Sequence, residues 1–418
     1  MPLLNFSLGS KHAGLQQYNL KVVLLGLFIG SVLFSRTISI GILGAYTILL
    51  FFSTSLKEKK ERLLEHKAVL LLSLLFLLLA LSLLYSQHNG LPYLEKELLL
   101  LILPLVIGST NLNTSDVSGI LRLYVISCLL FTLVSIVEAY QFYTLPTEHF
   151  STQHLPHQLS DRIHAPYLSL LLVLANLSIL LINNSRVRFF KADLVLCLYF
   201  SMFILVLSSR TALFCNLFLL VAYLYFRLAK QKKVGMYITF LAMLVIVIGL
   251  TFKNYAHFQE RFAAITSAGY GVSERVTIYR ASLSIIQEHP LTGVGIGDIQ
   301  AELDKVYENW ALPEHFFEFN PHNQYLHVTM AVGVIGLLLF LYLLLFPVYL
   351  AVKAKKPLFA AFYFIFILAF LTEVVLSRYW GVATFAFFYS AFTTYLIDQK
   401  NLAKPLNRSY TQLVPSDK

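Results

Sequence analysis

The stretch NQYLHVTMAVGVIGLLLFLYLLLFPVYLA, residues 323–351, carries no Lys, Arg, Asp or Glu. A helix of about 20 apolar residues crosses the roughly 30 Å of hydrocarbon in a bilayer. Comparable runs follow one another along the whole chain, which is 57% apolar and 13% charged, with mean hydropathy +0.70. Soluble domains are about 45–50% apolar and roughly 25% charged. The sequence therefore predicts an all-α polytopic membrane protein and excludes a soluble α/β protein.

Working outward from this run, the pattern predicts about 12 transmembrane helices. The first is followed by Ser35-Arg36-Thr37 rather than by a small-residue cleavage site, so we expect a retained span and not a signal peptide. The expected helices cover residues 20–34, 38–55, 68–85, 95–109, 118–141, 165–183, 192–208, 211–229, 234–252, 323–351, 357–376 and 380–398.

The orientation follows from the distribution of positive charge. When the segments between spans are counted alternately, 22 of the 32 Lys and Arg residues fall in short segments on the side of the two termini. Short cytoplasmic loops carry the excess of Lys and Arg, so both termini are expected in the cytoplasm. We therefore expect the chain to be organised as spans 1–9 in residues 1–252, an external loop in 253–322, spans 10–12 in 323–398 and a cytoplasmic tail in 399–418.

Several simple assignments find no support. The net charge of +10 lies between the spans, so it does not indicate nucleic-acid binding. The three cysteines have neither paired nor metal-binding spacing, and we interpret them as small buried apolar residues. His154 and His157 lie close in sequence but have no acidic or thiolate partner at a characteristic spacing. We predict no metal and no cofactor. The cysteines are Cys128, Cys197 and Cys215.

The external loop 253–322 is the largest departure from a simple bundle, and long loops are usually functional or disordered. Its pattern predicts an amphipathic helix over 273–288, with an apolar stripe, and a second helix over 299–310. Between them, Gly293-Val-Gly295-Ile-Gly297 has no third glycine at the spacing of G-x-G-x-x-G, and it follows no strand. We therefore interpret it as a backbone turn, with phosphate binding as the minor alternative. The stripe is Val276, Tyr279, Leu283 and Ile286.

Few arginines are expected on the outer side. Arg210 interrupts two apolar runs, and a charge so placed needs a partner or a water-filled cavity. It is either a snorkelling side chain at an interfacial turn or part of an anion site. Arg275 and Arg280 lie five residues apart, on partly overlapping faces, and are either solvated charges or further ligands of that anion. Guanidinium groups near one another suit a pyrophosphate.

His322 stands where the loop re-enters the membrane. A neutral imidazole there could accept a proton from a hydroxyl group, although a structural polar residue at the interface is the alternative. Glu138 and Glu373 lie near the ends of predicted spans and do not form a proton relay in this pattern, so a secondary transporter has no support from them.

Three motifs together resemble the O-antigen ligase and polymerase superfamily of bacterial envelope polysaccharide enzymes. They are RVTIYRASL from Arg275, HPLTGVGIG over 289–297, and His322-Asn323 followed after nine residues by Gly333-Val-Ile-Gly336. The resemblance also covers the twelve-span layout, the Ser-Arg break at Arg210 and the long outer loop, so its motifs extend from Arg210 to Gly336. The first 200 residues are similar only in hydropathy. Tyr279 stands where many members have tryptophan, a departure that we expect not to touch the chemistry.

The resemblance implies a GT-C-like glycosyltransferase of the bacterial inner membrane, working at the periplasmic face without nucleotide or metal. The donor would be a glycan on undecaprenyl diphosphate. Arg210 with Arg275 or Arg280 would grip the diphosphate, and His322 would be the general base. Asn323, with the glycine pair of the motif, completes the expected binding residues.

The glycines Gly333 and Gly336 would also allow close helix packing in the tenth span. The leading expectation is an O-antigen ligase acting on lipid A-core. The alternatives are an O-antigen polymerase, a related enzyme that glycosylates protein or builds capsule, and, from another class, a polysaccharide exporter or transporter.

Overall fold

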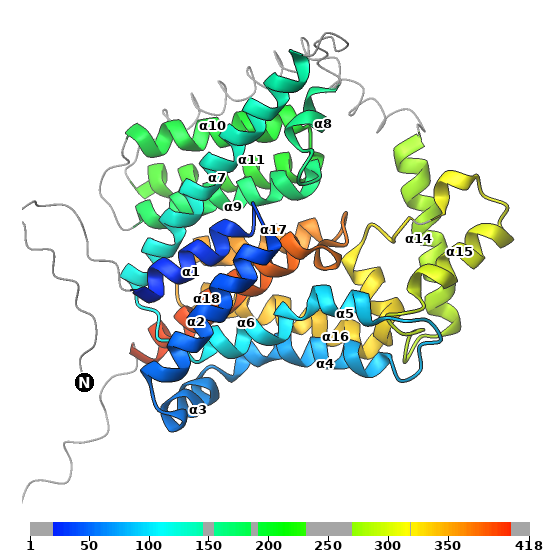
Figure 1. Ribbon diagram of the computed structural model, residues 1–418, viewed down its shortest axis with the longest axis horizontal. Coiled ribbons are helices and arrows are strands. Elements are labelled where there is room, and N and C mark those ends of the chain that lie inside the picture. The colour runs from blue at the N-terminus through cyan, green and yellow to red at the C-terminus, as the bar shows by residue number, and fades with distance from the viewer. Residues whose placement is uncertain (1–19, 145–153, 185–190, 231–269, 318, 403–418) are drawn as a thin grey trace, which may run out of the picture.

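The computed structural model describes residues 20–144, 154–184, 191–230, 270–317 and 319–402, and every element in these ranges is a helix (Figure 1). The elements are α1 (Leu20–Ser31), α2 (Arg36–Ser53), α3 (Leu56–Glu65), η1 (Lys67–Leu70), α4 (Leu71–Ser82), α5 (Leu91–Glu97), α6 (Leu99–Gly108), α7 (Thr114–Tyr143), α8 (Leu155–Leu159), α9 (Ala165–Asn184), α10 (Lys191–Leu207), α11 (Arg210–Lys230), α14 (Tyr270–Glu288), α15 (Ile299–Asn309), η2 (Glu314–Phe316), α16 (Gln324–Lys353), α17 (Pro357–Ala369), η3 (Val375–Ser377) and α18 (Tyr379–Leu402).

The polytopic membrane class is confirmed at a coarse level. Within the described ranges, five helices are long and apolar enough to cross a membrane, or six if the bent pair 56–65 and 67–82 is one span. Four shorter apolar helices accompany them, namely α1, α17 and the greater parts of α10 and α11. The expected ninth span, 234–252, lies outside the described residues. The count of twelve therefore stays a prediction.

Helix α18 lies at the core of the bundle, and 89% of its most apolar 18 residues are buried. The corresponding share for α2, at the periphery, is 17%. Rings of α18 pack among those of α17, with Phe385 lying 4.9 Å from Phe366 and 5.3 Å from Phe370 between centroids. Helix α16 packs against α4 and α17, while α9 lies between α7, α10 and α11. Helices α14 and α15 stand at one end of this bundle (Figure 1).

Two expected boundaries in the first half are wrong. The charged segment between the second and third predicted spans is a helix, α3, because Ser55 accepts a hydrogen bond from the Glu58 amide at its start and Arg62 lies 3.2 Å from the Glu58 carboxylate one turn on. The predicted helix 95–109 is two helices, α5 and α6, divided at Leu98.

The predicted span 357–376 is also too long. Helix α17 ends at Ala369, and the chain then runs through a non-helical segment to η3. This segment is held by its neighbours: the Phe370 carbonyl accepts from the Gln324 amide, and the Gln324 side chain accepts from the Leu376 amide. Glu373 therefore lies on an irregular turn at the end of the bundle rather than inside a helix.

The loop helices α14 and α15 are confirmed, but the expected apolar stripe of α14 is wrong. Val276 and Leu283 are 43% and 47% exposed. The buried positions follow the same helical spacing, shifted along the helix, so the true packing face is rotated from the expected one. They are Ile278, Ala281, Ser282 and Ile285.

The segment 289–298 is a backbone turn, as predicted, and it packs into a break in α16. Val332 and Gly333 leave helical geometry there, and Gly333 has φ +66°. The Met330 and Ala331 carbonyls accept hydrogen bonds from the Val294 and Gly295 amides at 2.7 and 3.1 Å. Since α16 occupies these two amides, they do not form a free phosphate cradle.

The glycine pair of α16 therefore has a different partner from the one we expected. A Cβ on Gly333 would lie 2.0 Å from the Leu291 carbonyl oxygen of the turn, whereas a Cβ on Gly336 would overlap the Val332 side chain one helical turn earlier. The expectation of close helix–helix packing is wrong, because Gly333 lets a loop, not a helix, approach the backbone.

The same turn is also attached to the first half of the chain. The Asp298 carboxylate accepts hydrogen bonds from the Gln87 and His88 amides at 2.8 and 2.7 Å and lies 2.8 Å from the His88 ring nitrogen Nδ1. Burial alone would raise the pKa of Asp298, but these hydrogen bonds outweigh it and hold the pKa below its ordinary value. Asp298 thus ties the external loop to the segment after α4.

Candidate functional site

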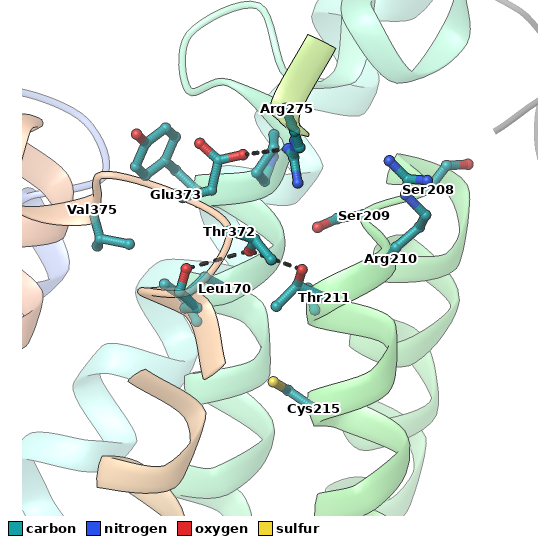
Figure 2. A pocket seen from close by; sticks show the side chains of 14 residues that line it. Leu170, Ser208, Ser209, Arg210, Thr211, Cys215, Arg275, Thr372, Glu373 and Val375 are labelled. Atoms are coloured by element: carbon teal, nitrogen blue, oxygen red, sulfur yellow. Dashed lines mark hydrogen bonds and ion pairs between the residues drawn. The ribbon is translucent and has the colours of Figure 1, made fainter. Parts of the chain in front are cut away.

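Arg210 and Arg275 line one pocket, although 64 residues of chain separate them (Figure 2). The pocket lies where the start of α9, the α10–α11 break, α14 and the end of α17 meet. Its volume is about 60 Å³, enough for roughly four water molecules. The hollow is open to solvent, so it can receive a small charged group while the rest of a larger substrate lies outside.

The break between α10 and α11 sets the position of Arg210. Helix α10 ends at Leu207, Ser208 takes the left-handed conformation with φ +55°, and α11 begins at Arg210 itself. The break predicted from the Ser-Arg interruption is therefore confirmed. Thr211, one residue on, lies 3.0 Å from the Thr372 hydroxyl and links α11 to the segment after α17.

Glu373 connects this pocket to His322. Its carboxylate lies 3.3 Å from the Arg275 guanidinium through Oε1 and 3.6 Å from Nδ1 of His322 through Oε2. The Glu373 side chain is 15% exposed, whereas those of Arg275 and His322 are 33% and 29% exposed. The Glu373 carboxylate thus lies between the Arg275 guanidinium and the His322 ring and is the most buried of the three side chains.

The backbone around His322 is unusual. His322 has φ +46°, a region that residues other than glycine rarely occupy and that concentrates at functional sites. Its amide donates to the Asn320 side chain at 2.9 Å, which stabilises the turn. Asn323 then caps α16 by accepting from the Tyr325 and Leu326 amides, and its own amide group donates to the Leu371 carbonyl at 3.2 Å.

Tyr279 of α14 lies at the same junction. Its hydroxyl is 2.9 Å from the Leu371 carbonyl oxygen and 3.4 Å from the His322 carbonyl oxygen. The tyrosine at this position therefore attaches α14 both to the segment that carries Glu373 and to the backbone of His322.

The other expected arginine lies elsewhere. Arg280 is exposed and does not line the pocket. Five residues of α-helix turn by about 140°, so Arg275 and Arg280 point in different directions from one helix. As described above, Gly333 contacts the turn 289–298 and Gly336 contacts its own helix. Asn323 caps the start of α16.

Sequence reasoning missed Glu373, which we had set aside as a residue near the end of a span. Its position depends on the early end of α17, and the continuous apolar pattern of 357–376 hides that end. The signal available was the string Thr372-Glu373 inside an otherwise apolar segment, because a carboxylate at that depth requires a partner.

The comparison with known families bears on this region. Residues 194–341 match the model of the O-Antigen ligase family. This match covers about a third of the chain and supports its similarity to the O-antigen ligase and polymerase superfamily. The matched segment contains Arg210, Arg275 and His322, and it ends before Glu373. No curated protein matches the chain at a significant level.

The similarity of residues 194–341 to the O-Antigen ligase family supports a glycosyltransferase-like membrane enzyme of ligase or polymerase type. Cys128, Cys197 and Cys215 are buried and unpaired in disulfides, as expected for small apolar residues. His154 precedes the short helix α8 and His157 lies within it, and neither lines the pocket. Within the described ranges, no three His, Cys, Asp or Glu side chains group as metal ligands.

Proposed function

We propose that this protein is an O-antigen ligase that transfers a glycan from undecaprenyl diphosphate to lipid A-core at the periplasmic face of the inner membrane. The observation that carries the proposal is the shared pocket of Arg210 and Arg275, joined to His322 through Glu373. Two guanidinium groups suit a diphosphate, and an imidazole at the edge suits an acceptor hydroxyl.

The transfer needs three events in one place. The acceptor hydroxyl oxygen forms a bond to the anomeric carbon of the donor, and the bond from that carbon to the diphosphate oxygen breaks. The electron pair leaves with the diphosphate, where Arg210 and Arg275 stabilise the developing negative charge. The hydroxyl proton passes to His322, so no charge is left on the new glycosidic oxygen.

Glu373 influences which nitrogen of the His322 ring carries the proton. Nδ1 of His322 makes no hydrogen bond within the described residues, and the Glu373 carboxylate lies 3.6 Å from it. A small approach of the two groups would close a hydrogen bond that favours the tautomer with its proton on Nδ1, leaving Nε2 as the basic atom. The same carboxylate stabilises the imidazolium that forms during transfer. It also holds Arg275 in place before the diphosphate arrives, which reduces the reorganisation needed on binding.

The small pocket favours a site at the membrane surface, because a lipid-borne donor enters sideways and presents only its diphosphate to the arginines. An O-antigen polymerase would use the same chemistry on a different acceptor and remains the second candidate. A polysaccharide exporter of another class would need a continuous path and no base.

A gel of lipopolysaccharide from a deletion strain tests the proposal. We expect complete loss of glycan from lipid A-core, with polymer accumulating on its carrier. A core bearing one repeat unit would identify a polymerase instead. Complementation with His322→Ala is expected to fail for an enzyme, whereas a normal ladder from both His322→Ala and Arg210→Ala would refute the mechanism and favour the exporter.

A further inference from the structure

A second cavity lies at the other end of the bundle from the candidate site. Helix α9 runs from Tyr167, which lines the first pocket, to Leu181, which lines the second. Helix α17 likewise separates Lys356 at its start from Glu373 beyond its end, and its 13 residues span about 20 Å. The two sites are therefore distinct.

This cavity has a volume of about 310 Å³ and is lined by α7, α9, α17, α18 and the turn between α16 and α17. Its wall has two chemical parts. One part offers two ammonium groups and three hydroxyls, and the other is apolar. Among the residues that the structure describes, no carboxylate lines it. The polar part is Lys355, Lys356, Thr114, Ser118 and Tyr395, and the apolar part includes Leu121, Leu181 and Phe359.

The polar part is ordered by its own contacts. The Lys356 Nζ atom lies 2.9 Å from the Tyr395 hydroxyl and 4.6 Å from the centroid of that ring. The same hydroxyl is 3.2 Å from that of Thr114, which joins α18 to the start of α7. Lys355 adopts φ +55°, so the turn brings two successive lysines to the cavity by leaving helical geometry.

A neighbouring cavity shows the contrast. It is lined by Lys21 and Arg62, but the Lys21 Nζ atom lies 2.7 Å from the buried Asp116 carboxylate, and Arg62 pairs with Glu58. Its positive charge is thus balanced within the protein. The partners of Lys356 are neutral, namely Tyr395 and, at 3.5 Å, the Gln399 side-chain oxygen. These neutral partners leave the positive charge of the larger cavity available to a ligand.

We propose that this cavity binds the phosphate headgroup of an anionic phospholipid. Ammonium and hydroxyl donors bind phosphate oxygens, and basic pockets between membrane helices accept anionic headgroups. The apolar wall along Leu121, Leu181 and Phe359 accommodates the start of an acyl chain. A free phosphate ion would use the donors but leave this wall uncovered, so the lipid is the favoured source of the phosphate. The bound lipid joins the α16–α17 turn to α7 and α18.

Thermal unfolding of the purified full-length protein in neutral detergent tests this inference. The probes are phosphatidylglycerol, phosphatidylcholine and inorganic phosphate. The charge variant is Lys355→Gln with Lys356→Gln, and the matched control is Lys353→Gln, which makes the same change two residues earlier at a side chain bonded to Tyr349 and outside the cavity. Ser118→Phe fills the cavity without changing its charge. Circular dichroism checks the fold of each variant.

Phosphatidylglycerol is expected to raise the melting temperature more than phosphatidylcholine does. The double variant should weaken its apparent affinity by about thirtyfold, since each lysine near an anionic headgroup contributes about fivefold. Ser118→Phe should also weaken binding, while Lys353→Gln should stay within about twofold of the native protein. Equal shifts with both lipids, an equal shift with inorganic phosphate alone, or an equal loss in Lys353→Gln would each overturn the proposal.

Discussion

At the scale of single residues, Glu373 is the group on which the candidate site depends most. Its carboxylate is the only acidic side chain that lines the pocket among the described residues, and it contacts both Arg275 and His322. A residue so placed acts on the reaction through its two neighbours. It is a positioning residue in the proposed transfer, and its effect can be separated from a general loss of structure.

We expect Glu373→Gln to lower kcat by about 10- to 100-fold, because the glutamine no longer orients the imidazole or balances its charge. Glu373→Asp, which keeps the charge, should recover part of the loss. The decisive measurement is a double-mutant cycle with His322→Ala in an in vitro transfer assay. If Glu373 acts through His322, the second change adds little. Fully multiplicative losses would count against the connection.

The two arginines of α14 make a matched pair. Arg275 lines the pocket and Arg280 is exposed on another face of the same helix. Arg275→Gln is expected to reduce transfer by about 10²- to 10³-fold through lost stabilisation of the leaving diphosphate, whereas Arg280→Gln should leave it nearly unchanged. Transfer rates of both variants are measured in the same assay. A larger loss in Arg280→Gln than in Arg275→Gln would place the diphosphate on the exposed face of α14 instead.

At the scale of elements, the break in α16 and the glycine turn 289–298 form one unit. Carbonyls freed by the break are used by amides of the turn, so neither element is stable in this form without the other. The arrangement also determines where α14 ends and hence where it presents Arg275.

Gly333→Ala is expected to destabilise the protein by about 1–3 kcal/mol or more, because alanine is strained at φ +66° and its Cβ would lie 2.0 Å from the Leu291 carbonyl oxygen. Gly41→Ala is the control, since nothing lies within 4 Å of its added Cβ on α2. Thermal unfolding measures both. A melting temperature unchanged by Gly333→Ala would show that the turn does not depend on this approach.

At the scale of the whole molecule, the external loop is held against segments far away in sequence. The Ser82 hydroxyl accepts from the Ile296 amide, and Asp298 accepts from the Gln87 and His88 amides. These contacts join residues more than 200 positions apart, so they decide how the loop sits over the bundle.

The Asp298 contact predicts a pH dependence. The pKa of Asp298 is lowered in the folded protein, so its contribution to stability is fully present above the ordinary aspartate pKa of about 4 and is lost as the pH falls through the folded value. The protection of the amides in 289–298, measured as the exchange rate relative to the intrinsic rate at each pH, should therefore be high at pH 7 and fall below about pH 4. Asp298→Asn should exchange faster already at neutral pH. Identical rates in the variant and the native protein at pH 7 would argue against the contact.

The proposed orientation is tested on the whole molecule by labelling single introduced cysteines with a membrane-impermeant thiol reagent, since the three native cysteines are buried. Lys305→Cys, on α15, is expected to react in intact spheroplasts, because the predicted orientation places the loop in the periplasm. Lys353→Cys, at the end of α16, should react only after the membrane is opened. The reverse pattern would invert the topology derived from the positive charges.

The sequence by itself determined the membrane class, the break before Arg210 and the helices of the loop, because hydropathy and helical spacing are local properties of the chain. It also singled out Arg210, Arg275 and His322 as candidates. Only the tertiary structure separated Arg275 from Arg280 and revealed Glu373, since both depend on where one helix ends and how another is rotated. The buried face of α14 and the partner of Gly333 were likewise decided by packing between distant segments, which no local pattern encodes.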